Sequence, residues 1–252
     1  MTVDFSAQCT WPNLAEPFAS ALRDAVEFIF KEFEPAGIIA TGTIVRGAAH
    51  ANSDLDLYVI RLGSHRRRVQ RFFRGVPAEI FVNPPSAVRS YFRDEDRDGR
   101  RLTAHMLATG VVVFQRDAVV DELRSEAREW LAKQTATSDF ERLATRYSIA
   151  SRLEDAIDVL ATDEVTATML LADSVTAMLE YACKTGTGAI PRRKDLLRTL
   201  AERHPDLARL ADAFFRTAPT RERADLALAL ADATIGARGF FEWDSGEGTA
   251  PE

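Results

Sequence analysis

Residues 53–60 read SDLDLYVI, an apolar run with two carboxylates at its beginning. Side chains two residues apart on a strand point to the same face, so Asp54 and Asp56 share one face while Leu55 and Leu57 point to the other. Two like charges held beside a core are costly unless a cation neutralises them, and a hard divalent ion prefers such oxygen ligands. The stretch therefore predicts a strand that begins at a metal site. The plainer alternative is an exposed strand end with two solvated aspartates.

A second motif lies upstream, where residues 41–47 read TGTIVRG. This pattern is typical of a turn from a strand into a helix. Its Gly42 lets a phosphate approach the backbone, and the Thr43 hydroxyl and exposed N–H groups can hold that phosphate. The motif favours a phosphate-bearing ligand next to the carboxylate strand.

A third acid lies downstream, because Glu79 comes early in the apolar run PAEIFV at 77–82. If this run forms a strand beside the first, Glu79 converges on Asp54 and Asp56. Three converging carboxylates can hold two metal ions, which bind the attacking and leaving oxygens of an in-line displacement at phosphorus.

The composition narrows the class of protein. The chain has 252 residues, of which 46% are hydrophobic and 28% charged, with a formal net charge of −6. This balance predicts a globular protein and disfavours a general binder of extended nucleic acid, while a nucleotide ligand remains compatible with it. The two cysteines, Cys9 and Cys183, lack a metal-site spacing and suit a reducing compartment. We see no signal-peptide pattern and no membrane-spanning run, and therefore expect a cytoplasmic protein without a membrane partner.

Hydrophobic periodicity predicts an α+β domain followed by an all-α helical bundle. The expected elements of the first part are a helix over 14–33, strands over 38–40 and 55–60, a hairpin of 66–73 and 78–82, a helical stretch after 84–85 that is interrupted near 98–99, and a strand over 111–114. Beyond Asp117 we expect helices over 117–133, 139–161, 164–183, 192–203, 206–216 and 221–238. The predicted domains are accordingly 1–116 and 117–243, with a disordered tail over 244–252.

These motifs resemble the signature of the DNA polymerase beta-type nucleotidyltransferase superfamily: a Gly-Ser turn, a spacer, an acidic-apolar-acidic-apolar strand and a later third acid. The pairs Arg46-Gly47 and Ser53-Asp54 are similar to its bacterial small-substrate branch, which includes aminoglycoside and minimal nucleotidyltransferases. The resemblance covers about residues 38–83. The chain departs from it at Thr43, where serine is usual, although the hydroxyl is kept.

The resemblance implies an N-terminal nucleotidyltransferase domain, with a mixed β-sheet flanked by helices, and a bundle that closes the cleft and binds the acceptor. The implied reaction moves a nucleoside monophosphate, AMP from ATP or another NTP, to a hydroxyl of a small molecule such as an aminoglycoside-like antibiotic, or of a protein, and releases pyrophosphate. The implied catalytic and Mg²⁺-binding residues, for two ions, are Asp54, Asp56 and Glu79, with Glu79 as either a metal ligand or the base. The implied nucleotide-binding residues are Gly42, Thr43, Arg46, Ser53 and Lys194. For Arg46 and Ser53, the alternatives are a solvated arginine and a plain turn or cap serine.

Lys194 enters through a basic cluster in the second half. Residues 185–195, TGTGAIPRRKD, are similar to the Thr-Gly-x-Ile and Lys-Asp elements of streptomycin/spectinomycin-type adenylyltransferases, with a longer spacer here. The spacer leaves open which of Arg192, Arg193 and Lys194 contacts phosphate. An ordinary turn between helices with a solvated basic cluster is the alternative.

Other interpretations stay open at this point. The chain could be a nucleotide-binding regulatory module without turnover, or a toxin–antitoxin component, for which the spacing of Arg198 and His204 is a weak signal. Acids of the bundle could contact a cationic acceptor or merely be solvated; they are Glu154, Asp155 and Asp158. A run of arginines predicts a solvated strand edge that resists aggregation; it comprises Arg61, Arg66, Arg67, Arg68, Arg71 and Arg74.

Overall fold

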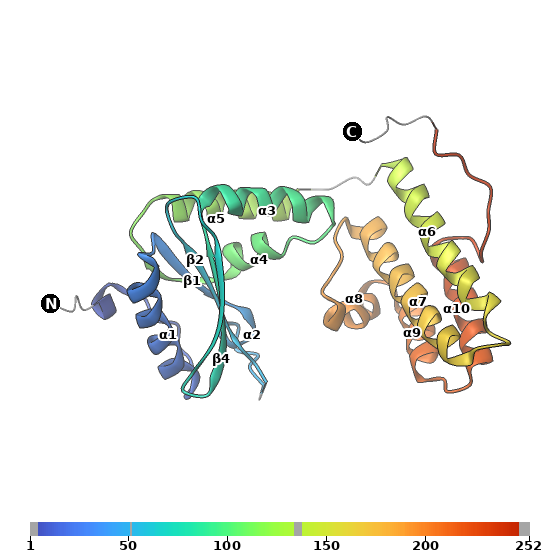
Figure 1. Ribbon diagram of the computed structural model, residues 1–252, viewed down its shortest axis with the longest axis horizontal. Coiled ribbons are helices and arrows are strands. Elements are labelled where there is room, and N and C mark those ends of the chain that lie inside the picture. Colours follow the sequence, from blue (N-terminus) through green and yellow to red (C-terminus); the bar gives the residue numbers. More distant parts are fainter. Residues whose placement is uncertain (1–4, 51, 134–137, 247–252) are drawn as a thin grey trace. The chain divides into compact units, whose positions relative to one another are not determined.

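The computed structural model describes residues 5–50, 52–133 and 138–246, and its elements are labelled in Figure 1. The chain divides into two compact units between Lys133 and Gln134. The first unit contains all five strands of the described chain, and the described part of the second is helical. The α+β fold class and the mixed sheet are thereby confirmed.

A five-stranded sheet forms the middle of the first unit, with the strand order β3-β4-β2-β1-β5. Its strands are β1 (Gly37–Thr41), β2 (Leu55–Ile60), β3 (Arg67–Phe73), β4 (Val76–Asn83) and β5 (Val111–Gln115). β2 and β4 run parallel, and every other neighbouring pair is antiparallel. The predicted hairpin is present as β3 and β4, and β3 lies at an edge of the sheet with most of its side chains exposed.

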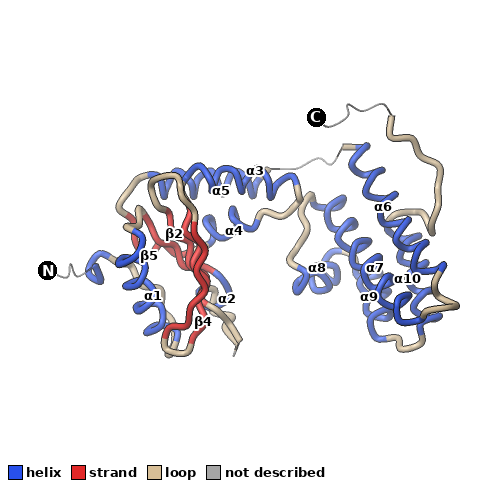
Figure 2. The backbone as a smooth tube through the Cα atoms, in the orientation of Figure 1, coloured by secondary structure: helices blue, strands red, loops and turns tan. Residues whose placement is uncertain are grey.

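Helices cover both faces of this sheet (Figure 2). They are α1 (Phe18–Phe33), α2 (Gly42–Val45), α3 (Pro85–Arg97), α4 (Leu102–Thr109) and α5 (Val119–Ala132), with a short 3-10 turn at Phe5–Gln8. Alternation along β2 separates two cores: Leu57 packs with Val26 of α1, whereas Tyr58 packs with Leu107 of α4 and Leu123 of α5. The carboxylate face of β2 is therefore the face that α3, α4 and α5 partly cover.

α5 corrects the domain boundary expected near Asp117. Its apolar side chains Val120, Leu123 and Ala127 are buried against the first unit, so the unit ends at Lys133. Helical periodicity shows that α5 has an apolar face, but it carries no information about the partner of that face. Of the tail predicted over 244–252, residues 247–252 lie outside the described part of the chain.

The second unit is the expected bundle. Its helices are α6 (Asp139–Asp158), α7 (Glu164–Thr187), α8 (Leu196–Arg203), α9 (Pro205–Arg216) and α10 (Thr220–Thr234), with a 3-10 turn at Arg193–Asp195. Leu153, Leu171, Leu200, Phe214 and Leu230 are buried in one shared core. No helix in the described ranges combines the length and the apolar character that a bilayer crossing needs.

Several helix ends differ from the expected ones for local reasons. α1 begins after Pro17, because a residue that precedes proline is disfavoured in helical conformation. α7 continues through Gly186, which the sequence placed in a turn, and ends at Gly188 with φ 74°. α10 ends at Thr234, just before Gly236 with φ 64°.

The assignment of α5 to the first unit can be tested with Leu123→Ala. We expect this change to lower the free energy of unfolding of the first unit by about 2–5 kcal/mol, because it leaves a cavity in a closed core. Ser125→Ala, at an exposed position of the same helix, is the matched control. Native-state hydrogen exchange should show faster exchange in β2 and unchanged exchange in α7. The opposite pattern would place α5 with the bundle.

Candidate active site

Two of the three acids, Asp56 and Glu79, lie on a row of residues that crosses the sheet. The strand registers set Thr41 opposite Asp56, Asp56 opposite Glu79, and Glu79 opposite Gln70. Asp54 precedes β2 by one residue and shares the face of Asp56. The neighbouring strands on which the predicted convergence depended are therefore present.

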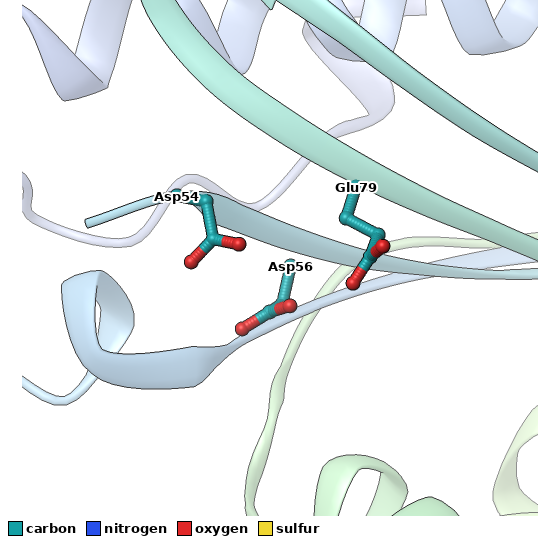
Figure 3. Close-up of side chains that lie close together, drawn as sticks. All are labelled: Asp54, Asp56 and Glu79. Atoms are coloured by element: carbon teal, nitrogen blue, oxygen red, sulfur yellow. The ribbon is translucent and has the colours of Figure 1, made fainter. Parts of the chain in front are cut away.

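The carboxylates meet at one point of this row, as Figure 3 shows. Carboxylate oxygens of Asp54, Asp56 and Glu79, one from each, all lie within 4.8 Å of one another. Opposite ligands of an octahedral Mg²⁺ are about 4.2 Å apart, twice the usual bond of about 2.1 Å. Asp54 is exposed, and Asp56 and Glu79 are partly buried. Spacing, charge and donor type all fit a hard divalent cation.

Two features require glycine at position 42: its backbone conformation and the close approach of the Asp56 carboxylate. Gly42 follows β1 directly and has a φ of 88°, a backbone conformation that residues other than glycine rarely adopt. A Cβ at this position would lie 2.2 Å from Oδ2 of Asp56. The backbone at Gly42 and the Asp56 carboxylate are thus in direct contact, which places the predicted phosphate turn against the cluster of acids.

The segment between α2 and β2 is held by the hydroxyl of Ser53. This side chain is 2% exposed. Its Oγ accepts hydrogen bonds from Thr43 Oγ1 at 3.3 Å and from the backbone N of His50 at 2.9 Å. Ser53 thereby positions the residue before Asp54. Arg46 is exposed on the same segment. Nucleotide contact by Thr43, Ser53 and Arg46 stays a prediction.

Two residues that the sequence interpretation missed hold Glu79 in place. Arg68 donates to Glu79 Oε1 from Nε at 3.0 Å and from a terminal nitrogen at 2.5 Å, and Gln70 Nε2 donates to the same oxygen at 2.7 Å. All of these bonds use Oε1. In the described chain no donor contacts the second oxygen of Glu79, which leaves that oxygen to a metal ion or a proton.

The sequence of the β3–β4 hairpin indicates the contact between Arg68 and Glu79. Arg74 and Gly75 both have positive φ, 50° and 80°, as expected for a two-residue hairpin turn. Counting back from such a turn sets Gln70 opposite Glu79 and puts Arg68 on the same face. The arginine run is thus only partly the solvated edge that we expected, because Arg68 faces the acids.

The basic cluster belongs to the second unit. Arg192 forms an ion pair with Asp195 at 2.9 Å, and Arg193 pairs with Glu180 at 3.2 Å. Lys194 is exposed and has no ion-pair partner within the residues that the structure describes. Its contact with phosphate stays a prediction.

The weak signal for a toxin–antitoxin role has a simple local explanation. Arg198 forms ion pairs with Asp195 and Glu202 on the same turns of α8, as is usual for charges at helix positions three and four apart. Glu154, Asp155 and Asp158 are exposed on α6. In the described ranges, none of these residues belongs to a group of three or more acids, cysteines or histidines that could hold a metal ion.

No family model and no curated protein sequence matches the chain. Among solved structures, it is similar to a nucleotidyltransferase-like protein from Exiguobacterium sibiricum 255-15. The TM-score is 0.51 at 16% sequence identity, and the match covers 86% of this chain and 74% of that one. The chain therefore has a nucleotidyltransferase-like fold.

The contact between Gly42 and Asp56 makes a prediction for metal binding. We expect Gly42→Ala to weaken Mn²⁺ binding at least tenfold, measured by calorimetric titration, because the new methyl group displaces the Asp56 carboxylate. It should also destabilise the fold by more than about 1 kcal/mol through its positive φ.

Gly47→Ala is the matched control. Gly47 also has a positive φ, 73°, but an added Cβ would meet nothing within 4 Å. This variant should lose stability and keep its Mn²⁺ affinity. Equal losses of affinity in both variants would show that backbone strain, and not the approach to Asp56, governs the site.

Proposed function

We propose that this chain is a Mg²⁺-dependent nucleotidyltransferase that moves a nucleoside monophosphate, AMP from ATP, onto the hydroxyl of an acceptor and releases pyrophosphate. The observation that carries the proposal is the convergence of Asp54, Asp56 and Glu79 at one point of a nucleotidyltransferase-like sheet. One exposed and two half-buried carboxylates this close together repel one another, and a bound cation would remove that repulsion.

Each part of the site has a role in this reaction. Asp54 and Asp56 would hold Mg²⁺, which when bound neutralises charge on the phosphate oxygens. The backbone at Gly42 and the hydroxyl of Thr43 would hold the phosphates on the β1 side of Asp56. Glu79 lies on the other side, oriented by Arg68 and Gln70, where its second oxygen can bind metal or accept the proton of the acceptor's hydroxyl.

Removing one charge from the cluster tests the proposal. We expect Asp56→Asn to lower Mg²⁺-dependent pyrophosphate release from ATP at least a thousandfold across a panel of hydroxyl acceptors, since it removes a metal ligand. The melting temperature should stay the same or rise, because repulsion among the carboxylates is relieved. Asp98→Asn, at an exposed helix end, should leave both quantities unchanged. Full activity of Asp56→Asn would exclude the metal-site assignment.

The same assay separates the proposal from its main rival. Tight binding of ATP and Mg²⁺ by the unaltered chain, without pyrophosphate release for any acceptor of the panel, would instead assign a nucleotide-binding regulatory module.

The basic cluster provides a further prediction. If Lys194 contacts the triphosphate, Lys194→Gln should raise KM for ATP about tenfold, equivalent to about 1.4 kcal/mol. Arg192→Gln and Arg193→Gln are matched controls and should change KM little, since both arginines are paired with acids of their own unit. A larger effect of either control would transfer the phosphate contact to that arginine.

A further inference from the structure

A cavity of about 450 Å³ lies in the first unit and is separate from the cluster of acids. Its walls come from the sheet and from two helices: Tyr58, Phe81 and Asn83 from β2 and β4, Tyr91 from α3, Thr103 from α4, and Arg66 at the edge. Pockets of about 300–1,000 Å³ are typical of small-molecule sites. The cavity has the volume for one small ligand.

The cavity begins where the row of acids ends. Tyr58 and Phe81 each follow an acid, Asp56 and Glu79, by two positions, so they lie on the same face about 7 Å further along their strands. Arg68 joins the two places, because it lines the cavity, lies 4.8 Å from the Phe81 ring centroid and donates to Glu79. A ligand in the cavity can therefore extend to Glu79.

The position of the cavity in the sheet distinguishes it from the expected phosphate turn. The strand order places β1, which leads to Gly42, on one side of β2, and β4 and β3 on the other. Phosphates held at Gly42 would lie on the β1 side of Asp56, whereas Glu79 and the cavity lie on the β4 side. An in-line displacement needs its attacking and leaving groups on opposite sides of phosphorus.

The floor of the cavity contains a polar group that the protein leaves unsatisfied. Tyr58 is 1% exposed, and its buried hydroxyl lies beside the side chains of Asn83 and Thr103 without a hydrogen bond of ordinary geometry to any described residue. Side chains that line the cavity surround this hydroxyl, including those of Asn83, Thr103 and Tyr91. Burial raises the pKa of Tyr58, so the group is a neutral hydroxyl that can donate or accept. A buried hydroxyl without a well-formed hydrogen bond is unfavourable, and a polar group of a ligand that reaches it, once a lining side chain moves aside, would supply the bond.

The charges around the cavity are positive toward its opening. Arg66 donates to the Tyr91 hydroxyl at 2.8 Å and has no carboxylate partner within the described ranges. The one acid of the wall, Glu95, is already engaged, since it accepts from the backbone N and the hydroxyl of Thr103 at 2.7 and 2.6 Å. A cationic ligand would meet an unneutralised arginine, whereas an anionic group would gain an ion pair.

We propose that this cavity binds the acceptor of the transfer reaction, and that the acceptor is a neutral or anionic small molecule with a flat ring. The ring would lie against Tyr58 and Phe81, whose own rings stack with centroids 6.0 Å apart. A polar group of the ligand would meet the Tyr58 hydroxyl, and an anionic group would meet Arg66. Polycations such as aminoglycosides are excluded from the cavity by this assignment.

The identification of this ligand as the acceptor rests on the proposed function. In the step that it implies, the hydroxyl oxygen of the ligand forms a bond to the α-phosphorus of ATP while the bond to pyrophosphate breaks. Glu79 is connected to the cavity by Arg68, which lines the cavity and donates to Glu79, and the hydroxyl proton passes to Glu79.

Binding of three probes of equal shape tests the cavity without nucleotide or metal. We would titrate the full chain with 4-hydroxybenzoate, 4-hydroxybenzamide and 4-hydroxybenzylamine, which are anionic, neutral and cationic, and follow ligand binding by saturation-transfer NMR. The expected order of affinity is anionic, then neutral, with the cationic probe at least fivefold weaker than the neutral one. Cationic binding equal to or tighter than the others, or no binding of any probe at millimolar concentration, would overturn the proposal.

Two variants locate the binding within the cavity. Tyr58→Phe should weaken the neutral and anionic probes at least threefold, with an unchanged or higher melting temperature because the lost hydroxyl made no well-formed hydrogen bond. Arg66→Gln should abolish the preference for the anionic probe. Arg71→Gln is its matched control, since Arg71 is on β3, the strand that follows Arg66 directly, and lies over the Phe28 ring, against α1. A lower melting temperature with unchanged affinity in Tyr58→Phe would show a structural role and overturn the assignment.

Asp56→Asn keeps this test independent of the reaction. This variant should bind the probes as the unaltered chain does, while its pyrophosphate release is lost. Probe binding by an unaltered chain that never releases pyrophosphate would reject the proposed function and leave the cavity as a ligand site. Pyrophosphate release without probe binding would support the proposed function and reject the cavity as a ligand site.

Discussion

Three carboxylates with oxygens within 4.8 Å of one another repel, and the arrangement of the first unit follows from the need to hold them together. At an effective dielectric constant near 20, two such charges repel by roughly 3–4 kcal/mol. The strand that carries two of them is anchored by Leu55, Leu57 and Val59, each 0% exposed. Full burial of such a side chain contributes about 1.5–3 kcal/mol, so the three together exceed the repulsion between Asp54 and Asp56, the two acids that this strand positions. The apolar half of β2 therefore fixes the acidic half.

The neighbours of the acids limit the remaining freedom. Gly42 lies against Asp56 so closely that no side chain fits, and Arg68 and Gln70 bind one oxygen of Glu79. Arg68 is 63% exposed, so its ion pair is worth at most about 1 kcal/mol and orients the carboxylate more than it stabilises the fold. Orientation is the relevant property for a site that must present free oxygens on one side.

One face of the sheet thus carries three places in a spatial order that differs from the order of the chain. The glycine turn at Gly42 follows β1, Asp56 and Glu79 lie on β2 and β4 with Asp54 just before β2, and the cavity extends along β2 and β4 to α3 and α4. Under the proposed function, this order is the path of the reaction from leaving group to acceptor. Arg66, at the edge of the cavity, then favours neutral or anionic acceptors. The resemblance of the sequence motifs alone had suggested a cationic antibiotic.

Which residues share a strand face or a helix face could be predicted from the amino-acid sequence alone. The alternation in SDLDLYVI placed Asp54 with Asp56, and the pattern around Gly42 indicated a turn, because the periods of strands and helices are set by local backbone geometry. Other features depend on long-range packing. β4 pairs with β2 in parallel, so that Glu79 is level with Asp56, and Arg68 binds Glu79. α5 packs in the first unit, and a cavity opens beside Tyr58. Partner and register depend on the summed packing of segments far apart in the chain, and local periodicity contains no record of that sum.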